Sequence, residues 1–441
     1  MTSLTFFDTL LNEADIRFVF AVLKEFVHMI YDPIRMSCGM NKERRVDWTA
    51  FACLAALCVV SVFLFLKEAR IDLVDFSVHM NIAGDFDFSD LHTITSRLAY
   101  PMWHLLVSII YQLGVPLHWA AIFVSVLCKA VAYALVYWLV DTLSMRQAKR
   151  WAVALLSLAA VTVTGLWIRP VSWCVYKGVG SPNVWHNPTQ LAVSAAMLMV
   201  MPWLVHCWCE FERALSDGRR NVMLPWWKVV VLIILTMGSL ACKPTFMQAL
   251  LPAAFVMYLV ELIRHKSEWR YFGQIVVAFL PAVAYFLLQY LYYTGVVVEF
   301  TSGVEIGITA QSAWLAVRNT LMMSACPFMA LVACWRKGML KDRSLLLALL
   351  MTAFSVLEAM AFRETGLREG HGNFTWAANS SSMYLWVVML GVFLRSFLSD
   401  RKNGMTALRK IGYALTAALF AWHVVSGVYY IWHLLVHANA F

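Results

Sequence analysis

The feature that most constrains this chain is a series of long apolar runs separated by short polar gaps. A helix needs about 20 apolar residues to cross about 30 Å of hydrocarbon, whereas a membrane β-barrel would show short alternating segments. The unbroken runs therefore predict an all-α, polytopic helical membrane protein. We expect eleven membrane-spanning helices, at 48–66, 116–140, 151–168, 188–207, 226–242, 245–262, 272–293, 313–335, 344–361, 382–396 and 411–433.

Composition excludes a soluble chain, because 61% of the 441 residues are hydrophobic and only 14% are charged. A single transmembrane domain is expected over 48–441. The preceding segment, 1–47, has apolar residues such as Phe18 and Val22 beside charged ones such as Arg17 and Lys24. This pattern predicts an amphipathic helix lying in the cytoplasmic membrane interface.

Basic residues orient the chain, because they gather in alternate gaps between the apolar runs. With the N-terminus in the cytoplasm, 25 of the 35 Lys and Arg residues fall on the cytoplasmic side. The net charge of +9 is spread over these short loops rather than gathered on one domain. Membrane lipids are therefore expected partners, and nucleic acid is not.

The first extracytoplasmic loop, 67–115, holds a group of acidic residues. If 71–80 is helical, Asp75 and His79 share a face and can approach one reacting centre, while Asp85 and Asp87 follow closely. The alternative is that these are solvated loop acids. An amphipathic helix on the membrane surface is expected from Met102 to Val115.

Polar residues in the second extracytoplasmic loop, 169–187, precede a proline at 188. Lys177, His186 and Asn187 suit an anionic headgroup and sugar hydroxyls, although His186 also suits an interfacial aromatic belt. Lys243 lies between two spans, where it either reaches lipid phosphates or binds a phosphorylated ligand.

The remaining extracytoplasmic loops are 294–312 and 362–381, and the latter is rich in charge. Its candidate substrate-binding residues are Arg363, Glu364, Arg368, His371 and Trp376. Arginine binds phosphate oxygens in a fork, and tryptophan stacks on sugar faces. Ion pairing among these arginines and glutamates is the alternative.

The segments DLVDFSVH, DFDFSD, YPMWHLL, KPTF and ETGLREGHGNFTW, in this architecture, resemble the GT-C class of membrane glycosyltransferases and related bacterial polysaccharide polymerases. The resemblance covers most of the chain as architecture but only short motifs as sequence. It implies a polyprenyl-phosphate or polyprenyl-diphosphate sugar donor and a glycan or lipid-linked acceptor. It also implies polysaccharide biosynthesis for the cell envelope, at the extracytoplasmic face of the bacterial inner (plasma) membrane.

Residue roles follow from this resemblance. Asp75 best matches the base that deprotonates the acceptor hydroxyl, with Asp85 and Asp87 as rivals and His79 or His186 as an orienting group. Cations on the same side would stabilise the leaving phosphate; they are Lys177, Lys243, Arg363 and Arg368. No cofactor is assigned, and the acidic residues of the first outer loop permit a divalent metal without requiring it.

Two other classes of protein remain as alternatives. A transporter or flippase for a lipid-linked glycan predicts ionisable residues within the spans, where Lys129 and Glu358 are candidates. A non-catalytic assembly factor would bind a partner through its outer loops. A protein of this class gives no common reason why acidic residues gather in one outer loop and cations in the others.

Overall fold

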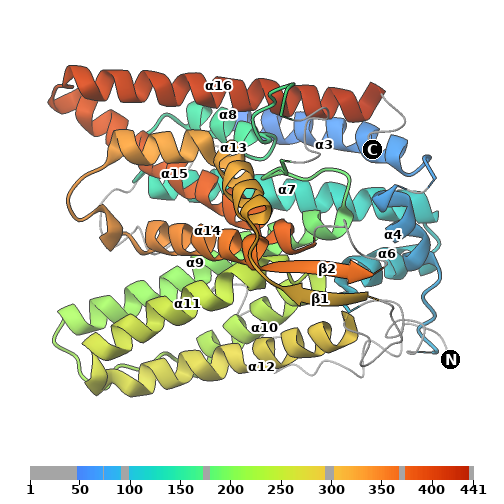
Figure 1. Cartoon of the computed structure of the whole chain (residues 1–441), viewed down its shortest axis with the longest axis horizontal. Coiled ribbons are helices and arrows are strands. Elements are labelled where there is room, and N and C mark those ends of the chain that lie inside the picture. The colour runs from blue at the N-terminus through green and yellow to red at the C-terminus, as the bar shows by residue number, and fades with distance from the viewer. Residues whose placement is uncertain are drawn as a thin grey trace.

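A computed structural model describes residues 47–72, 74–90, 99–171, 179–293, 302–366 and 373–436. These ranges are almost entirely helical, with one short two-stranded sheet. The elements, labelled in Figure 1, are α3 (Trp48–Glu68), α4 (Asp75–Gly84), α6 (Met102–Gln112), α7 (Leu117–Leu143), α8 (Arg150–Ala160), α9 (Pro188–Ser216), α10 (Trp226–Cys242), α11 (Thr245–Arg264), α12 (Trp269–Tyr293), β1 (Ser302–Ile306), α13 (Ala310–Cys334), α14 (Arg343–Ala361), β2 (Phe362–Gly366), α15 (Trp376–Asn403) and α16 (Ala407–Val436). Three 3₁₀ turns complete them, at Lys266–Glu268, Met339–Lys341 and Asn373–Thr375.

Each expected span coincides with an apolar helix. Within the described ranges nine helices are long and apolar enough to cross a membrane, and the remaining two, α8 and α10, have 11 and 17 residues. The chain is therefore an all-α protein with the architecture of a polytopic membrane protein. The expected amphipathic helices of the first outer loop correspond to α4 and α6.

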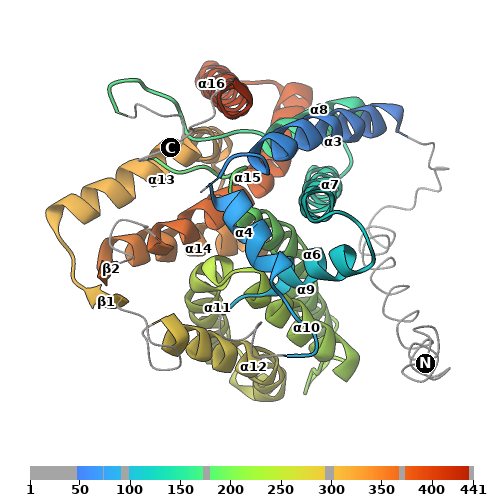
Figure 2. The same cartoon turned by 90° about the vertical axis from the view of Figure 1, so that its right-hand side faces the viewer.

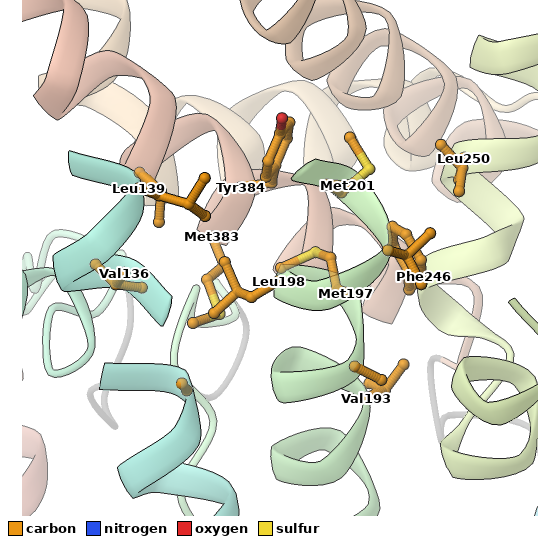
Figure 3. Close-up of a cluster of buried hydrophobic side chains, with 14 of the residues drawn as sticks. Val136, Leu139, Val193, Met197, Leu198, Met201, Phe246, Leu250, Met383 and Tyr384 are labelled. Atoms are coloured by element: carbon orange, nitrogen blue, oxygen red, sulfur yellow. The ribbon is translucent and has the colours of Figure 1, made fainter. Parts of the chain in front are cut away.

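Two helices occupy the centre of the bundle. In their most apolar windows, 83% of α9 and 78% of α15 is buried, compared with 28% of α3 and 33% of α16. Figure 3 shows Met197 and Met201 of α9 beside Phe246 of α11 and Met383 of α15 in the hydrophobic core. The peripheral helices instead expose large apolar side chains such as Phe255, at 66%, as expected of a lipid-facing surface.

The helix expected over 151–168 is shorter than predicted, because α8 ends at Ala160. The chain then runs through a buried, non-helical segment at 161–168. Irregular backbone is tolerated at membrane depth where protein groups satisfy its hydrogen bonds. Here Asn183 Nδ2 donates to the carbonyls of Ala160 and Val163, at 2.8 and 2.9 Å.

The small elements lie together at one end of the helices. Figure 1 shows α4, α6 and the two-stranded β1–β2 sheet on the right, and Figure 2 views this end face-on. The strands pair antiparallel, with Glu305 opposite Arg363. We call this the α4 end. Sequence analysis predicts that it is extracytoplasmic, and that the opposite end is cytoplasmic.

Candidate functional site

Asp75 begins α4 and points its carboxylate toward the start of α9. The helix is anchored by buried residues of its other face, where the Phe76 ring stacks on Phe65 at 5.3 Å between centroids. The Asp75 side chain remains 44% exposed. It is therefore held by the protein on one side and accessible on the other.

Asn187 fixes this carboxylate by donating a hydrogen bond from Nδ2 to Asp75 Oδ2, at 2.8 Å. Asparagine is a favoured N-cap, and Pro188 follows at the first helical position, where a missing N–H is tolerated. As the cap of α9, Asn187 Oδ1 accepts from the Gln190 backbone N–H at 3.0 Å and from the Thr189 hydroxyl at 2.7 Å. These bonds assign the amide orientation and leave Nδ2 to donate to Asp75.

Lys243 lies next to Asn187, in the turn between α10 and α11. It is only 4% exposed, and its Nζ donates to Asn187 Oδ1 at 3.3 Å and lies 3.7 Å from the centre of the Trp376 ring. The ammonium therefore points inward rather than reaching out to lipid. Burial lowers the pKa of Lys243 to about 7, an effect that the charges of Asp75 and Glu364 oppose.

His186 approaches the same carboxylate from the loop before α9. Its Nε2 lies 3.9 Å from Asp75 Oδ2, and its Nδ1 shares a 3.0 Å hydrogen bond with the Tyr430 hydroxyl of α16. Burial lowers the pKa of His186 to about 4 against the attraction of Asp75. The imidazole is therefore neutral near pH 7.

Asp75 remains ionised in this setting. Partial burial raises its pKa, but the combined effect of His186, the Asn187 amide, Lys243 and His79 outweighs burial and holds the pKa below its usual value. A charged, half-exposed carboxylate at neutral pH can accept a hydrogen bond from a ligand hydroxyl.

A second pair of imidazoles adjoins Asp75 on α4. His79 Nδ1 and His104 Nε2 of α6 are 2.9 Å apart, so one ring donates to the other. Burial lowers the pKa of His79 to about 4 and that of His104 well below its usual value. The pair is neutral near pH 7 and joins α4 to α6.

Asp85 and Asp87, the rival acids, lie beyond the other end of α4. Ten residues of helix place Asp85 about 15 Å along the axis from Asp75. Both are exposed, and Asp87 Oδ1 accepts from the backbone N–H and hydroxyl of Ser89, at 2.8 and 2.7 Å. These bonds lower the pKa of Asp87 and stabilise the local turn.

The charged residues of β2 divide between two roles. Arg363 makes a two-pronged ion pair with Glu305 of β1, at 2.8 and 3.0 Å, so its partner comes from the 294–312 loop and not from the glutamates of its own loop that the sequence offers as the alternative. Glu364, next in the strand, interacts electrostatically with Lys243. Trp376 starts α15 instead of lying in a loop, and its ring faces Lys243.

Several predicted features lie outside the described residues. They are the N-terminal interfacial helix, the start of the loop at 294–312, and the substrate-binding candidates Lys177, Arg368 and His371. Among the residues that the structure does describe, no group of three or more His, Cys, Asp or Glu side chains is arranged to hold a metal ion.

Three contributors to the site escaped sequence analysis. Glu68, buried at the end of α3, interacts electrostatically with Asp75, although sequence analysis gave it no role. Tyr430 lies 244 residues from His186, so no local pattern relates the two. His104 falls within the YPMWHLL segment, but only the packing of α6 on α4 reveals its contact with His79.

Comparison with known proteins assigns no family: no protein-family model matches the chain, and no curated protein matches it.

Proposed function

We propose that this protein is a glycosyltransferase or polysaccharide polymerase of the GT-C kind, using a polyprenyl-phosphate or polyprenyl-diphosphate sugar at the α4 end. The observation that carries the proposal is the Asp75 carboxylate, which is 44% exposed yet fixed by Asn187 at 2.8 Å. A base in glycosyl transfer needs this combination of a fixed position and an open face.

In the proposed reaction, Asp75 accepts the proton of the acceptor hydroxyl as its oxygen bonds to the anomeric carbon of the donor. The bond from that carbon to the phosphate oxygen breaks, and the lipid phosphate or diphosphate leaves with the electron pair. Lys243 is too buried to contact this phosphate and serves as a positioning residue, holding Asn187 and favouring the ionised form of Asp75.

Of the cations that the sequence offers for the leaving phosphate, Arg363 is the described one other than Lys243. Its ion pair with Glu305 is exposed on both sides, at 47% and 53%, and exposed pairs contribute little stability. A diphosphate can therefore replace Glu305 and accept two parallel hydrogen bonds from the guanidinium.

The first prediction tests the base. Asp75→Asn keeps the size of the side chain but removes the proton acceptor, so we expect glycan transfer by the purified protein to fall by about 10²- to 10⁴-fold. Asp87→Asn is the matched control, because that carboxylate is exposed beyond the end of α4 away from Asp75 and accepts hydrogen bonds from Ser89. Full activity of Asp75→Asn, or an equal loss in Asp87→Asn, would eliminate Asp75 as the base.

The second candidate function is transport or flipping of a lipid-linked glycan. It is favoured by the non-helical segment that follows α8, because discontinuous helices often form transport sites within the membrane. Lys129 donates to the Val161 carbonyl of that segment, at 3.4 Å. Movement of a labelled lipid-linked glycan across proteoliposomes, without new glycosidic bonds, would favour this function over the transferase.

A further inference from the structure

A cavity of about 940 Å³ opens at the end of the molecule opposite Asp75. It lies between the last turns of α13 and α15 and beneath the loop that follows α7. Four cationic side chains line it, and no carboxylate is among the lining residues that the structure describes; the four are Arg336, Lys337, Arg395 and Lys402. The described lining of the cavity is therefore basic, whereas in an ordinary network of surface ion pairs carboxylates lie among the cations.

Two of these cations are held in place by carboxylates outside the lining. Arg336 pairs with Asp400, which also binds Arg409, and Arg395 Nη2 lies 3.4 Å from Asp342 Oδ2. The Asp400 carboxylate thus pairs with two guanidinium groups, those of Arg336 and Arg409. The positive charge of the cavity wall is fixed in position but only partly compensated.

The other two cations, Lys337 and Lys402, are exposed and pair with no carboxylate within the described ranges. The cavity also has an apolar part, formed by Met145, Val392 and Leu398. Trp335, beside the basic pair at 336–337, is 53% exposed, as is common for tryptophan at a membrane–water interface.

The loop that covers the cavity has an unusual backbone and follows a close contact between α7 and α15. Met145 and Arg146 both adopt left-handed backbone conformations, with φ of 55° and 54°, which is uncommon for residues other than glycine. Just before them, α7 approaches α15 so closely that a Cβ at Gly391 would collide with the side chain of Leu143. Strained backbone of this kind gathers at binding sites more often than elsewhere.

We propose that this cavity binds an organic phosphate. Guanidinium and ammonium groups in one concave site match phosphate oxygens, and the cavity is far larger than inorganic phosphate requires. The apolar part accommodates the remainder of the ligand. The phosphate belongs either to the headgroup of an anionic lipid or to a soluble phosphorylated molecule, and the two sources share the same recognition chemistry.

The test uses the full-length protein in two lipid settings. In nanodiscs of phosphatidylcholine alone, binding of a soluble organic phosphate, phenyl phosphate, is measured by titration calorimetry. In nanodiscs that also contain phosphatidylglycerol, the lipid retained by the protein is counted by native mass spectrometry. Binding in the first setting indicates a soluble source and retention in the second a lipid source, and either supports the proposal.

The decisive variant is Lys337→Gln combined with Lys402→Gln. We expect about 25-fold weaker binding, from about fivefold for each lysine. Lys266→Gln combined with Lys410→Gln removes the same charge from the same end of the molecule but outside the cavity, and should leave affinity nearly unchanged. The proposal is overturned by no binding in either setting, or by equal weakening in both double variants.

Discussion

At the scale of single residues, Lys243 shows that burial lowers the pKa of an ammonium group even though the group keeps its hydrogen-bond and aromatic contacts. Its Nζ contacts the amide oxygen of Asn187 and the face of the Trp376 ring. The negative charge of Asp75 raises the pKa of Lys243, against the effect of burial. A lysine in this setting exchanges its proton near neutral pH rather than near pH 10.5. The charge that favours ionised Asp75 is therefore itself sensitive to pH.

A second prediction concerns stability and follows from this shift. Between pH 7 and 10.5 the unfolded chain holds a proton on Lys243 that the folded protein lacks, so this residue makes stability rise with pH. In Lys243→Met that contribution is absent. The difference in unfolding free energy between wild type and variant should grow in favour of wild type by about 1.4 kcal/mol per pH unit above about pH 7.

Unfolding of the detergent-solubilised protein between pH 6 and 9 measures this difference. Thr245→Val is the control, since it removes a hydrogen bond to Gln190 in the same cluster but no titratable group. Its difference from wild type should stay constant with pH. A constant difference for Lys243→Met as well would contradict the assigned shift.

Several residues of the site were predictable because local signals mark them. Asn187 precedes a proline at a helix start, Lys243 lies between two apolar runs, and Asp75 and His79 are four residues apart on one helix. These signals predict that they lie at one end of the helices, and the structure brings them together there. Sequence analysis did not exclude Asp85, because the direction in which α4 runs away from α9 depends on tertiary packing.

At the scale of elements, the end of α8 is the feature that hydropathy did not reveal. The apolar run continues to 168, but the helix stops at Ala160, and groups distant in sequence satisfy the backbone beyond it. His423 of α16 contacts the Thr164 carbonyl at 2.7 Å, and Leu166 donates to the Met322 carbonyl at 2.9 Å. A hydropathy profile measures apolar length and contains no information about such partners.

A third prediction tests this element through Asn183. Asn183→Ala leaves the carbonyls of Ala160 and Val163 without that donor in a buried setting, so we expect a loss of about 2–4 kcal/mol in unfolding free energy. Asn81→Ala, at an exposed position of α4, should change stability by less than about 0.5 kcal/mol. Equal effects in thermal unfolding would show that the segment after α8 does not depend on this amide.

At the scale of the whole molecule, the general architecture was predictable and the packing order was not. Apolar length alone identified the positions of the helices, because a bilayer accepts few other spanning structures. That α9 and α15 occupy the centre follows from which faces pack, and window hydropathy alone does not set them apart from the other long helices. The two-stranded β1–β2 sheet pairs segments about 60 residues apart in the sequence, and no hydropathy signal marks it.

The final prediction concerns orientation, on which the proposed reaction depends. Basic loops favour the cytoplasm, so the α4 end should face outward. We expect Ser89→Cys, exposed after α4, to react with a membrane-impermeant maleimide in intact cells, and Thr406→Cys, exposed between α15 and α16, to react only after permeabilisation. Wild type provides the baseline for the native cysteines, including exposed Cys209. The reverse pattern would place Asp75 in the cytoplasm, where an extracytoplasmic polyprenyl-linked donor cannot reach it. That result would contradict both the predicted orientation and the proposed transferase function.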